Sequence, residues 1–353
     1  MAYTTIDNAE LFFQAKTYTG TGSAQSITLD GSEDMQPDWV WIKNRGLDAR
    51  HMLFDVARGA TKSMFSDQVT AETTSSGHLT SFNSNGFSLG DNSGTGSTNG
   101  SSETYVAWNW KAGGSASSNT DGSITTSVSA STTSGFSIAT YTSNGTAGAT
   151  VGHGLGVAPD MVWTLNRTGN DSYGVGSDAL PSWDYYLHLS RTLAQDNAQN
   201  VWNDTAPSSS VVTFGNNGRS NTPNDEDYVM YCFSSVKGFS KIGKYTGNGN
   251  ANGTFVYTGF RPAWVMMKRF DSTNDWFVYD NKRNTFNQTN LRISINSDSA
   301  ESTQTTNQID MLSNGFKCRG SAAATNTSGG SYLFMAFAES PLVNSKGVPN
   351  NAR

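Results

Sequence analysis

The stretch Trp39-Val40-Trp41-Ile42-Lys43 follows Pro37 and is apolar at each of its first four positions. Successive side chains of a strand point to opposite faces of a sheet, so the two Trp side chains face one way and Val40 and Ile42 the other. Such a strand is buried on both faces, or on one face and at a domain interface. The stretch therefore predicts a central strand of an all-β fold.

This stretch recurs twice, as Pro159-Asp160-Met161-Val162-Trp163 and Pro262-Ala263-Trp264-Val265-Met266. Two further motifs recur with it: an aromatic strand that ends in Tyr-Thr, and a closing strand that begins with Tyr. Their tyrosines are Tyr18, Tyr141 and Tyr245 for the first motif, and Tyr105, Tyr228 and Tyr332 for the second. The offsets are 122 to 123 residues, then 103 to 104. Because three motifs hold register to one residue, we expect three divergent copies of one unit.

The copies are short strands at regular spacing, closed by Gly and Asn turns, which is typical of antiparallel β-sandwiches of jelly-roll or lectin-like type. The expected division is an N-terminal segment 1–11, β-sandwich repeats 12–112, 135–236 and 237–340, a Gly/Ser/Thr linker 113–134 and a C-terminal tail 341–353. The linker composition favours flexibility, although Ile124 and Val128 leave a short strand open. Repeats two and three abut at 234–238, which predicts rigid packing there.

The composition excludes several classes of protein. Charged residues make up 15% of the 353 residues and the net charge is −6, so the concentrated positive charge that nucleic acid requires is missing. The start of the chain lacks the pattern of a signal peptide, and no stretch has the roughly 18 apolar residues of a membrane span. Cys232 and Cys318 fall in different repeats, which excludes a disulfide framework. Synthesis in a host cytoplasm and release by lysis, as for a phage virion protein, fits this combination.

Several short motifs resemble a tandem-repeat family of uncharacterised structural and tail proteins of marine bacteriophages. They are Tyr18-Thr19-Gly20, Arg58-Gly59, Asn85-Gly86-Phe87, Tyr105-Val106-Ala107-Trp108, and Gly154-Leu155-Gly156 with Pro159-Asp160. The resemblance covers most of the first repeat and parts of the others. It implies a virion component that works with other virion proteins, and it transfers no catalytic or binding residue.

The residues that carry catalysis or bind metals are sparse. The four histidines, His51, His78, His153 and His188, are not spaced as metal ligands, and no carboxylate pair recurs as a glycosidase would need. We therefore expect no enzyme, no cofactor and no metal. The acidic loops 30–34 and 225–227 leave calcium as an open alternative to solvated turns.

Two groups of residues are candidates for binding. Leu53-Phe54-Asp55-Val56-Ala57-Arg58 resembles Tyr186-Leu187-His188-Leu189-Ser190-Arg191 and Val278-Tyr279-Asp280-Asn281-Lys282-Arg283, so Arg58, Arg191 and Arg283 are the charges that persist. These arginines either bond to loop carbonyls and carboxylates or recognise an anion. Near one repeat position stand Trp183, Tyr185, Tyr186 and Trp276, which either pack in the core or form a platform for sugar rings.

The expected role is a non-enzymatic tail-fibre or host-adhesion component that binds a host surface glycan, because repeated sandwiches provide multivalent weak binding. Tail fibres commonly trimerise, so a homotrimer is the favoured oligomer, with segment 1–11 as the part that docks on the virion. The alternatives are a capsid decoration or head-fibre protein and a glycan-degrading tail enzyme. Membrane insertion is not expected.

Overall fold

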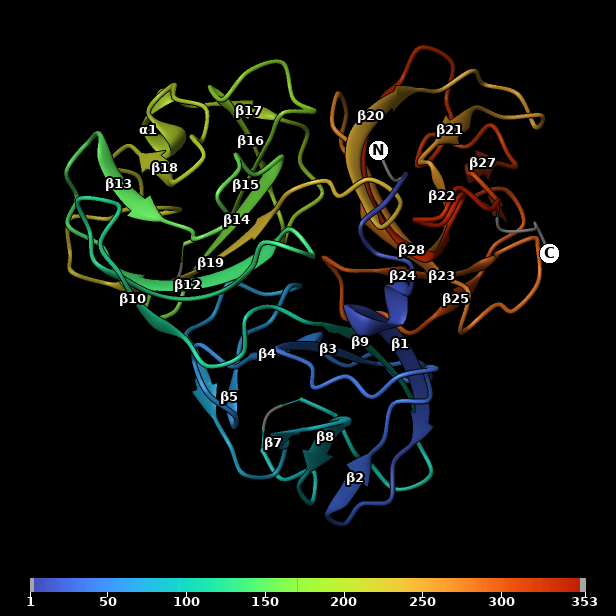
Figure 1. Cartoon of the computed structure of the whole chain (residues 1–353), viewed down its shortest axis with the longest axis horizontal. Helices are drawn as coiled ribbons and strands as arrows, with labels where there is room; N and C mark the ends of the chain where they lie inside the picture. Colours follow the sequence, from blue (N-terminus) through green and yellow to red (C-terminus); the bar gives the residue numbers. More distant parts are fainter. Residues whose placement is uncertain (1–2, 95, 170, 350–353) are drawn as a thin grey trace.

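The computed structural model describes residues 3–94, 96–169 and 171–349. It is an antiparallel all-β structure, as the sequence predicts. Figure 1 shows three β units around a common centre, with the blue unit below, the green and yellow unit at left and the orange and red unit at right. We refer to residues 12–112, 113–236 and 237–341 as units 1, 2 and 3.

Unit 1 pairs an inner sheet with a smaller outer one (Figure 1). The inner sheet has the order β1 (Phe13–Thr19), β9 (Thr104–Trp110), β3 (Trp39–Asn44), β4 (Met52–Asp55). The outer sheet has the order β2 (Gln25–Ile27), β8 (Gly86–Leu89), β7 (Leu79–Asn83), and a short ladder joins β5 (Lys62–Ser63) to β6 (Thr73–Thr74). The 3-10 helix η1 (Ala9–Leu11) precedes β1.

Unit 2 repeats this order and extends it at both edges. Its inner sheet runs β10 (Ser117–Asn119), β11 (Thr126–Ser131), β12 (Phe136–Thr142), β19 (Asp227–Phe233), β14 (Met161–Asn166), β15 (Gly174–Ser177), β16 (Tyr185–His188), β17 (Asp196–Asn197). The outer sheet is β13 (Ala149–Gly152) with β18 (Val211–Phe214), and the short helix α1 (Gln199–Trp202) lies before β18.

Unit 3 has the inner order β20 (Ser240–Thr246), β28 (Ser331–Pro341), β22 (Phe260–Arg269), β23 (Trp276–Asp280), β24 (Leu291–Ser294), β25 (Ser302–Thr303). The outer sheet is β21 (Phe255–Tyr257), β27 (Gly315–Cys318), β26 (Ile309–Leu312). The first four inner strands of unit 3 therefore match β1, β9, β3 and β4 of unit 1 in order.

The tyrosine motifs have the same packing role in each unit. Tyr18 stacks on Tyr105 with ring centroids 5.1 Å apart, and the hydroxyl of Tyr18 donates to the carbonyl of Thr98 at 2.7 Å. Equivalent pairs stack at 5.2 Å in unit 2 and 4.8 Å in unit 3; they are Tyr141–Tyr228 and Tyr245–Tyr332. Their strand partners are in direct register in all three sheets. The motifs thus recur because each pair joins the first strand to the closing strand.

The two faces of the central strand are buried against different neighbours. Trp39 and Trp41 belong to a core shared by all three units, whereas Val40 and Ile42 belong to the separate core of unit 1. This confirms the burial on two faces that the sequence predicts. In the shared core Trp39 lies 5.9 Å from Trp163, a distance between ring centroids.

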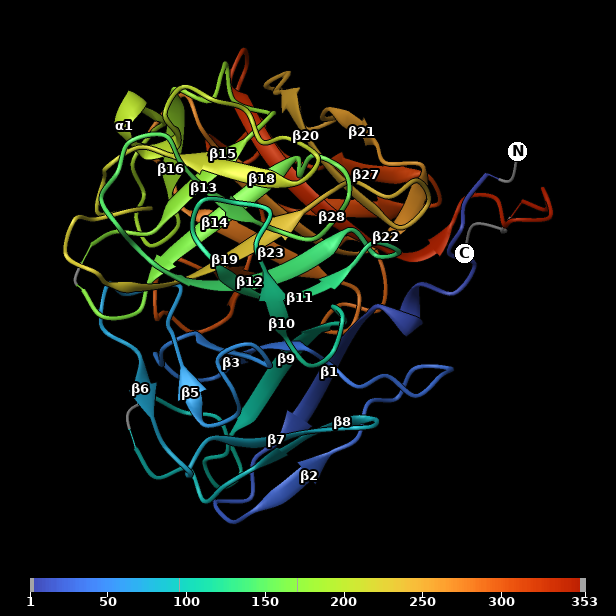
Figure 2. The same ribbon diagram turned by 60° about the vertical axis from the view of Figure 1, so that its left-hand side comes forward.

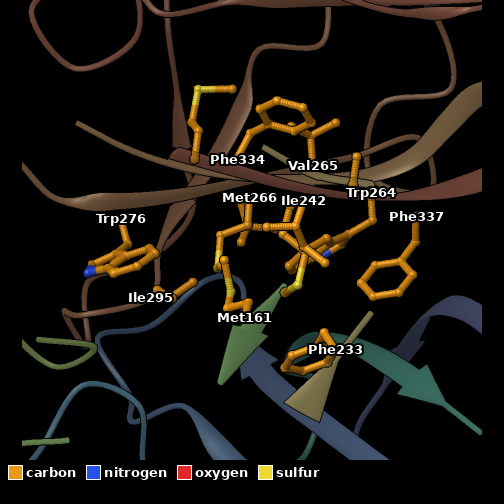
Figure 3. Packing of buried hydrophobic residues seen from close by; sticks show 14 of the residues in the cluster. Met161, Phe233, Ile242, Trp264, Val265, Met266, Trp276, Ile295, Phe334 and Phe337 are labelled. Atoms are coloured by element: carbon orange, nitrogen blue, oxygen red, sulfur yellow. The ribbon is translucent and has the colours of Figure 1, made fainter. Parts of the chain in front are cut away.

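The shared core joins every pair of units. Trp110 meets Trp264 at 5.5 Å, and Phe233 meets Phe337 at 6.4 Å between ring centroids. Figure 3 shows part of it, where Met161 and Phe233 of unit 2 face Trp264 and Phe337 of unit 3. The three inner sheets therefore close a ring around one aromatic centre.

Residues 113–134, expected as a flexible linker, instead form two strands at the edge of unit 2. β11 pairs with β12, and β10 pairs with β11 (Figure 2). Val128 is buried, so the short strand left open by Ile124 and Val128 is present around Val128. The backbone N–H and C=O groups at the edge of β12 pair with β11, and this orders a segment whose composition alone favours flexibility.

The described residues near each end of the chain lie against unit 3 and against each other. Ile6 and Ala9 are buried in the shared core, and the hydroxyl of Tyr3 donates to the carbonyl of Gly259 at 2.8 Å. The backbone N–H of Ser345 donates to Asp7. The described part of segment 1–11 is thus built into the ring, rather than projecting as a separate docking segment, and part of the expected tail is ordered.

Candidate functional site

Arg58 and Arg283 occupy the same place in units 1 and 3. Each guanidinium is buried and pairs through Nε with the carboxylate three residues earlier, at 2.5 Å to Asp55 and 2.5 Å to Asp280. Each also donates to a carbonyl of the strand that precedes it, that of Leu53 in β4 and that of Val278 in β23. Burial by itself lowers the pKa of Arg58, but Asp55 and Glu72 raise it above its ordinary value. Neither arginine is available to an external anion.

Arg191 is not the counterpart of these arginines. Asp55 lies opposite Trp39, and Asp280 opposite Trp264, but the residue opposite Met161 is Ser177 on β15. Counting three residues onward, the arginine position falls on the buried Leu180. Arg191 follows β16 and is exposed. The sequence alignment at this motif was therefore wrong, because it matched β16 to β4 and missed the Gly-rich strand β15.

The buried arginines belong to charge networks that cross between units. Glu72 of unit 1 accepts from Arg58 at 3.2 Å, and it accepts two bonds of 3.0 Å from Arg167 of unit 2. At the other interface, Glu301 of unit 3 accepts from Arg283 at 2.9 Å and binds Arg45 of unit 1 at 2.8 and 3.1 Å. Parallel bonds from one guanidinium to one carboxylate fix orientation as well as distance.

A backbone bond marks the same place at all three interfaces. The N–H of Glu72 donates to the carbonyl of Arg167 at 2.9 Å, and the N–H of Glu301 donates to the carbonyl of Arg45 at 2.9 Å. The third bond, at 2.7 Å, runs from the N–H of Gln195 in unit 2 to the carbonyl of Phe270 in unit 3. The interface between units 2 and 3 thus keeps this backbone bond but has the neutral residues Gln195 and Phe270 in place of the glutamate and the arginine.

Polar aromatic groups form a second set of equivalent contacts. The Tyr173 hydroxyl donates to Thr70, His51 Nε2 contacts Ser294 at 3.1 Å, and Trp276 Nε1 donates to His188 at 2.9 Å, each at a backbone carbonyl of the next unit. Trp41 donates to His51 Nδ1, so we place the proton of His51 on Nε2. Burial holds the pKa of His51 well below its ordinary value.

Of the two interpretations of the aromatic group, core packing holds for three of its four residues. Trp276 is fully buried at the interface of units 2 and 3, Trp183 is buried against Trp202, and Tyr186 is buried with its hydroxyl on Asp196. Tyr185 is half-buried. A sugar-binding platform needs exposed ring faces, and the rings of Trp183, Tyr186 and Trp276 are instead buried in the protein.

The acidic loops are occupied by contacts within the chain. Asp30 pairs with Lys16 at 3.2 Å and with Lys282 at 2.9 Å, and Asp34 accepts from Asn85 at 2.6 Å. In the second loop Glu226 accepts from Asn166. Within the described residues no group of three or more His, Cys, Asp or Glu could hold a metal ion, so the calcium alternative has no support from this geometry. Cys232 and Cys318 are buried free thiols.

One surface hollow lies between units 1 and 3. It has a volume of about 350 Å³ and is lined by β1, β22, β28 and the loop after β23. Phe286 is 83% exposed at its rim. Four of its charged residues are paired with each other, Lys282 with Asp30 and Arg261 with Glu339 at 2.6 Å. The internal pairs leave little unbalanced charge for a ligand.

The interface residues Arg45, Arg167, Glu72, Gln195 and Glu301 were not anticipated from the sequence. One signal existed: Arg45 and Arg167 are 122 residues apart, the spacing of Pro37 and Pro159. No signal pointed to Glu72 and Glu301, because the segment between the arginine and this glutamate differs in length between units.

Comparison with known proteins adds a family but no activity. A family model described as a domain of unknown function, DUF7483, matches residues 8–341, so the chain belongs to this family. The single match spans all three units. No curated protein and no solved structure matches the chain. Among the described residues, no helix is long and apolar enough to cross a membrane.

Proposed function

We propose that this protein is a non-enzymatic structural component of a bacteriophage virion, located on the tail as a host-adhesion or tail-fibre protein. One observation carries the proposal: the residues that recur between units serve packing and the joints between units. They include the stacked tyrosine pairs, the tryptophan strands and the buried Asp–Arg pairs. A repeated scaffold without a repeated cleft is typical of a structural role.

The closed ring supports mechanical rigidity. Each unit contacts both others through the shared aromatic core and through backbone bonds at all three interfaces. Separating one unit would expose apolar area at two interfaces at once, which costs about 25 cal/mol per Å² of apolar surface. A protein that holds a receptor-binding surface on a virion needs this stiffness.

A head location is the second candidate, and the ring itself favours it. Three similar units around one centre give the chain an approximately three-fold face (Figure 1). Such a face matches a three-fold position on a capsid, as a decoration or head-fibre protein would require. The expected homotrimer stays a prediction, and sedimentation analysis of the purified chain measures it.

The proposal is tested on purified virions. Mass spectrometry of gradient-purified particles should detect the chain at a defined copy number, and gold-labelled antibody should decorate the tail. Label on the head would replace the tail assignment with the decoration role. Absence of the chain from intact particles, with presence in the lysate, would overturn the virion proposal.

A further inference from the structure

A second hollow lies at an open edge of unit 3, where the first inner strand passes the first outer strand. This groove is lined by β20, β21 and Phe334 and has a volume of about 230 Å³. β20 and β21 both end the strand order of their sheets, and Figure 1 shows both in the upper part of unit 3. The groove is therefore bordered by two strands with free edges.

Exposed aromatic rings line one wall of this groove. Phe255 and Tyr257 of β21 are 44% and 48% exposed, although both stand on a strand. Tyr3 lies beside them, with its hydroxyl 3.3 Å from that of Tyr257. Large exposed rings that gather at one place on a protein surface mark interaction sites more often than scattered ones do.

Lysines surround the rings. Lys241 donates to the carbonyl of Tyr257 at 2.8 Å and lies 5.4 Å from the centre of its ring, and Lys237 lies 4.5 Å from the ring of Tyr3. Lys244 lines the groove, and Lys317 lies directly opposite Phe255 on β27. In the described part of the chain none of these four lysines forms an ion pair. The groove thus carries unbalanced positive charge in an acidic protein.

Unit 1 lacks these features at the same positions. Ile27 lies opposite Phe87 as Val256 lies opposite Phe316, so Ser26 and Thr28 stand where unit 3 has Phe255 and Tyr257. On the inner sheet, alignment of Tyr18 with Tyr245 places Gln14 and Thr17 at the positions of Lys241 and Lys244. The aromatic and basic residues are therefore absent from unit 1 and are not required by the fold that the two units share.

Unit 2 covers the corresponding edge. There β11 pairs along the whole of β12 except its last two residues, and β10 extends the sheet further. The strand edge that is open in unit 3 is thus paired in unit 2 with another segment of the chain (Figure 2).

We infer that the groove formed by Phe255, Tyr257, Lys241 and Lys244 binds an anionic oligosaccharide. Aromatic rings stack on the apolar faces of sugar rings, and ammonium groups bind their carboxylate, sulfate or phosphate substituents. Four lysines without carboxylate partners favour an anionic ligand. The two neighbouring rings favour a ligand with a flat apolar face. This site deepens the proposed adhesion function and rests on it for its biological meaning.

The test uses the whole chain and two soluble probes of similar length, an oligogalacturonate and the neutral oligosaccharide maltohexaose. Isothermal titration calorimetry should show binding of the acidic probe, weakening as salt rises, because exposed charge pairs are screened. Maltohexaose should bind at least about tenfold more weakly, a difference of about 1.4 kcal/mol. Equal binding of both probes, or none of the acidic one, would overturn the inference.

The variants place the residues of unit 1 into unit 3. Phe255→Ser with Tyr257→Thr, and separately Lys241→Gln with Lys244→Thr, should each lower affinity for oligogalacturonate about tenfold or more. Phe286→Ser and Lys282→Gln, which remove an exposed ring and a lysine from the hollow between units 1 and 3, are the matched controls and should bind as the parent does. Loss of binding in the controls alone would move the site to that hollow and contradict the inference.

Thermal unfolding of every variant shows whether it folds, and the two proposals fail separately. Detection of the chain in virions without oligogalacturonate binding removes the groove and leaves the virion role. Binding by a chain that is absent from virions removes the virion role. Binding of an acidic peptide such as oligoglutamate as tightly as oligogalacturonate would show that only charge is read and would overturn the assignment to a saccharide.

Discussion

The three interfaces between units, which we call joints, share one backbone hydrogen bond but differ in the side chains around it. At the interfaces of units 1 with 2 and 3 with 1, an Asp–Arg–Glu network inside one unit meets an arginine of the next. At the interface of units 2 and 3, the corresponding residues are Leu180, Gln195 and Phe270. Replacing a whole buried ion pair by well-packed apolar groups often leaves the free energy of unfolding nearly unchanged. Removing only one partner of the pair lowers it strongly. The comparison therefore predicts sharp differences between single and combined substitutions.

The largest effect is expected for Arg58→Leu, which puts the residue of unit 2 into unit 1. Asp55 would lose its buried partner and Glu72 would lose one of its partners. Breaking a buried pair in this way costs about 3–5 kcal/mol. Urea unfolding measures the change. Arg191→Ala, at an exposed arginine, should change stability by less than about 0.5 kcal/mol. Similar losses for both would contradict the difference between the joints.

A combined exchange should cost less than that single one. Asp55→Ser, Arg58→Leu, Glu72→Gln and Arg167→Phe together reproduce the residues found at the other joint. Only Lys62, whose side chain is exposed, loses an ion-pair partner, so no buried charge is left unpaired. We expect a loss of about 1–2 kcal/mol, because the hydroxyl of Tyr231 also loses Asp55, its acceptor at 2.7 Å. A combined loss larger than that of Arg58→Leu would show that the two joints are not interchangeable.

The joints should also differ in their response to acid. Burial raises the pKa of Glu72, but the bonds from Arg167 and Arg58 outweigh it, so its folded pKa lies below 4.5. Its stabilising contribution is complete above that value and is lost as pH falls through the folded pKa. Glu72→Gln should flatten the fall of stability below about pH 4.5.

His188 gives stability a different pH dependence at the interface of units 2 and 3. Burial, with Arg219 and Arg191, lowers its pKa from 6.5 to about 4. Because the unfolded chain takes up the proton first, stability falls as pH drops from 6.5 toward 4, by an amount on the order of 1 kcal/mol. His188→Asn should remove this slope in urea unfolding series, while Glu72→Gln should leave it. A slope unchanged by His188→Asn would contradict the assignment.

The smallest effect is expected at the groove of unit 3. Phe255→Ser with Tyr257→Thr changes half-exposed side chains on an edge strand, so the free energy of unfolding should shift by less than about 0.5 kcal/mol. Thermal unfolding measures it. A much larger loss would mean that the rings hold β21 in place, and their exposure would then need a structural explanation.

Much of this protein was fixed by local pattern. The alternation of large side chains in Trp39-Val40-Trp41-Ile42 requires a strand with two apolar faces, and the spacing of the tyrosines requires that the same strands pair in each unit. The sequence leaves two interpretations of Arg58 and Arg283: bonds to carboxylates and carbonyls within the chain, or recognition of an external anion. Their buried ion pairs favour the first.

Tertiary structure decided the rest, because it depends on residues far apart in the chain. Residues 117–119 and 126–131 became strands only because β12 offered them an edge. Trp276 is buried because unit 2 provides the carbonyl of His188 and apolar neighbours at that position. Glu72 and Arg167 are 95 residues apart, and nothing in their local sequence brings them together. Sequence determined the strands and their faces; the closing of the ring determined which of those faces became joints and which edge stayed open.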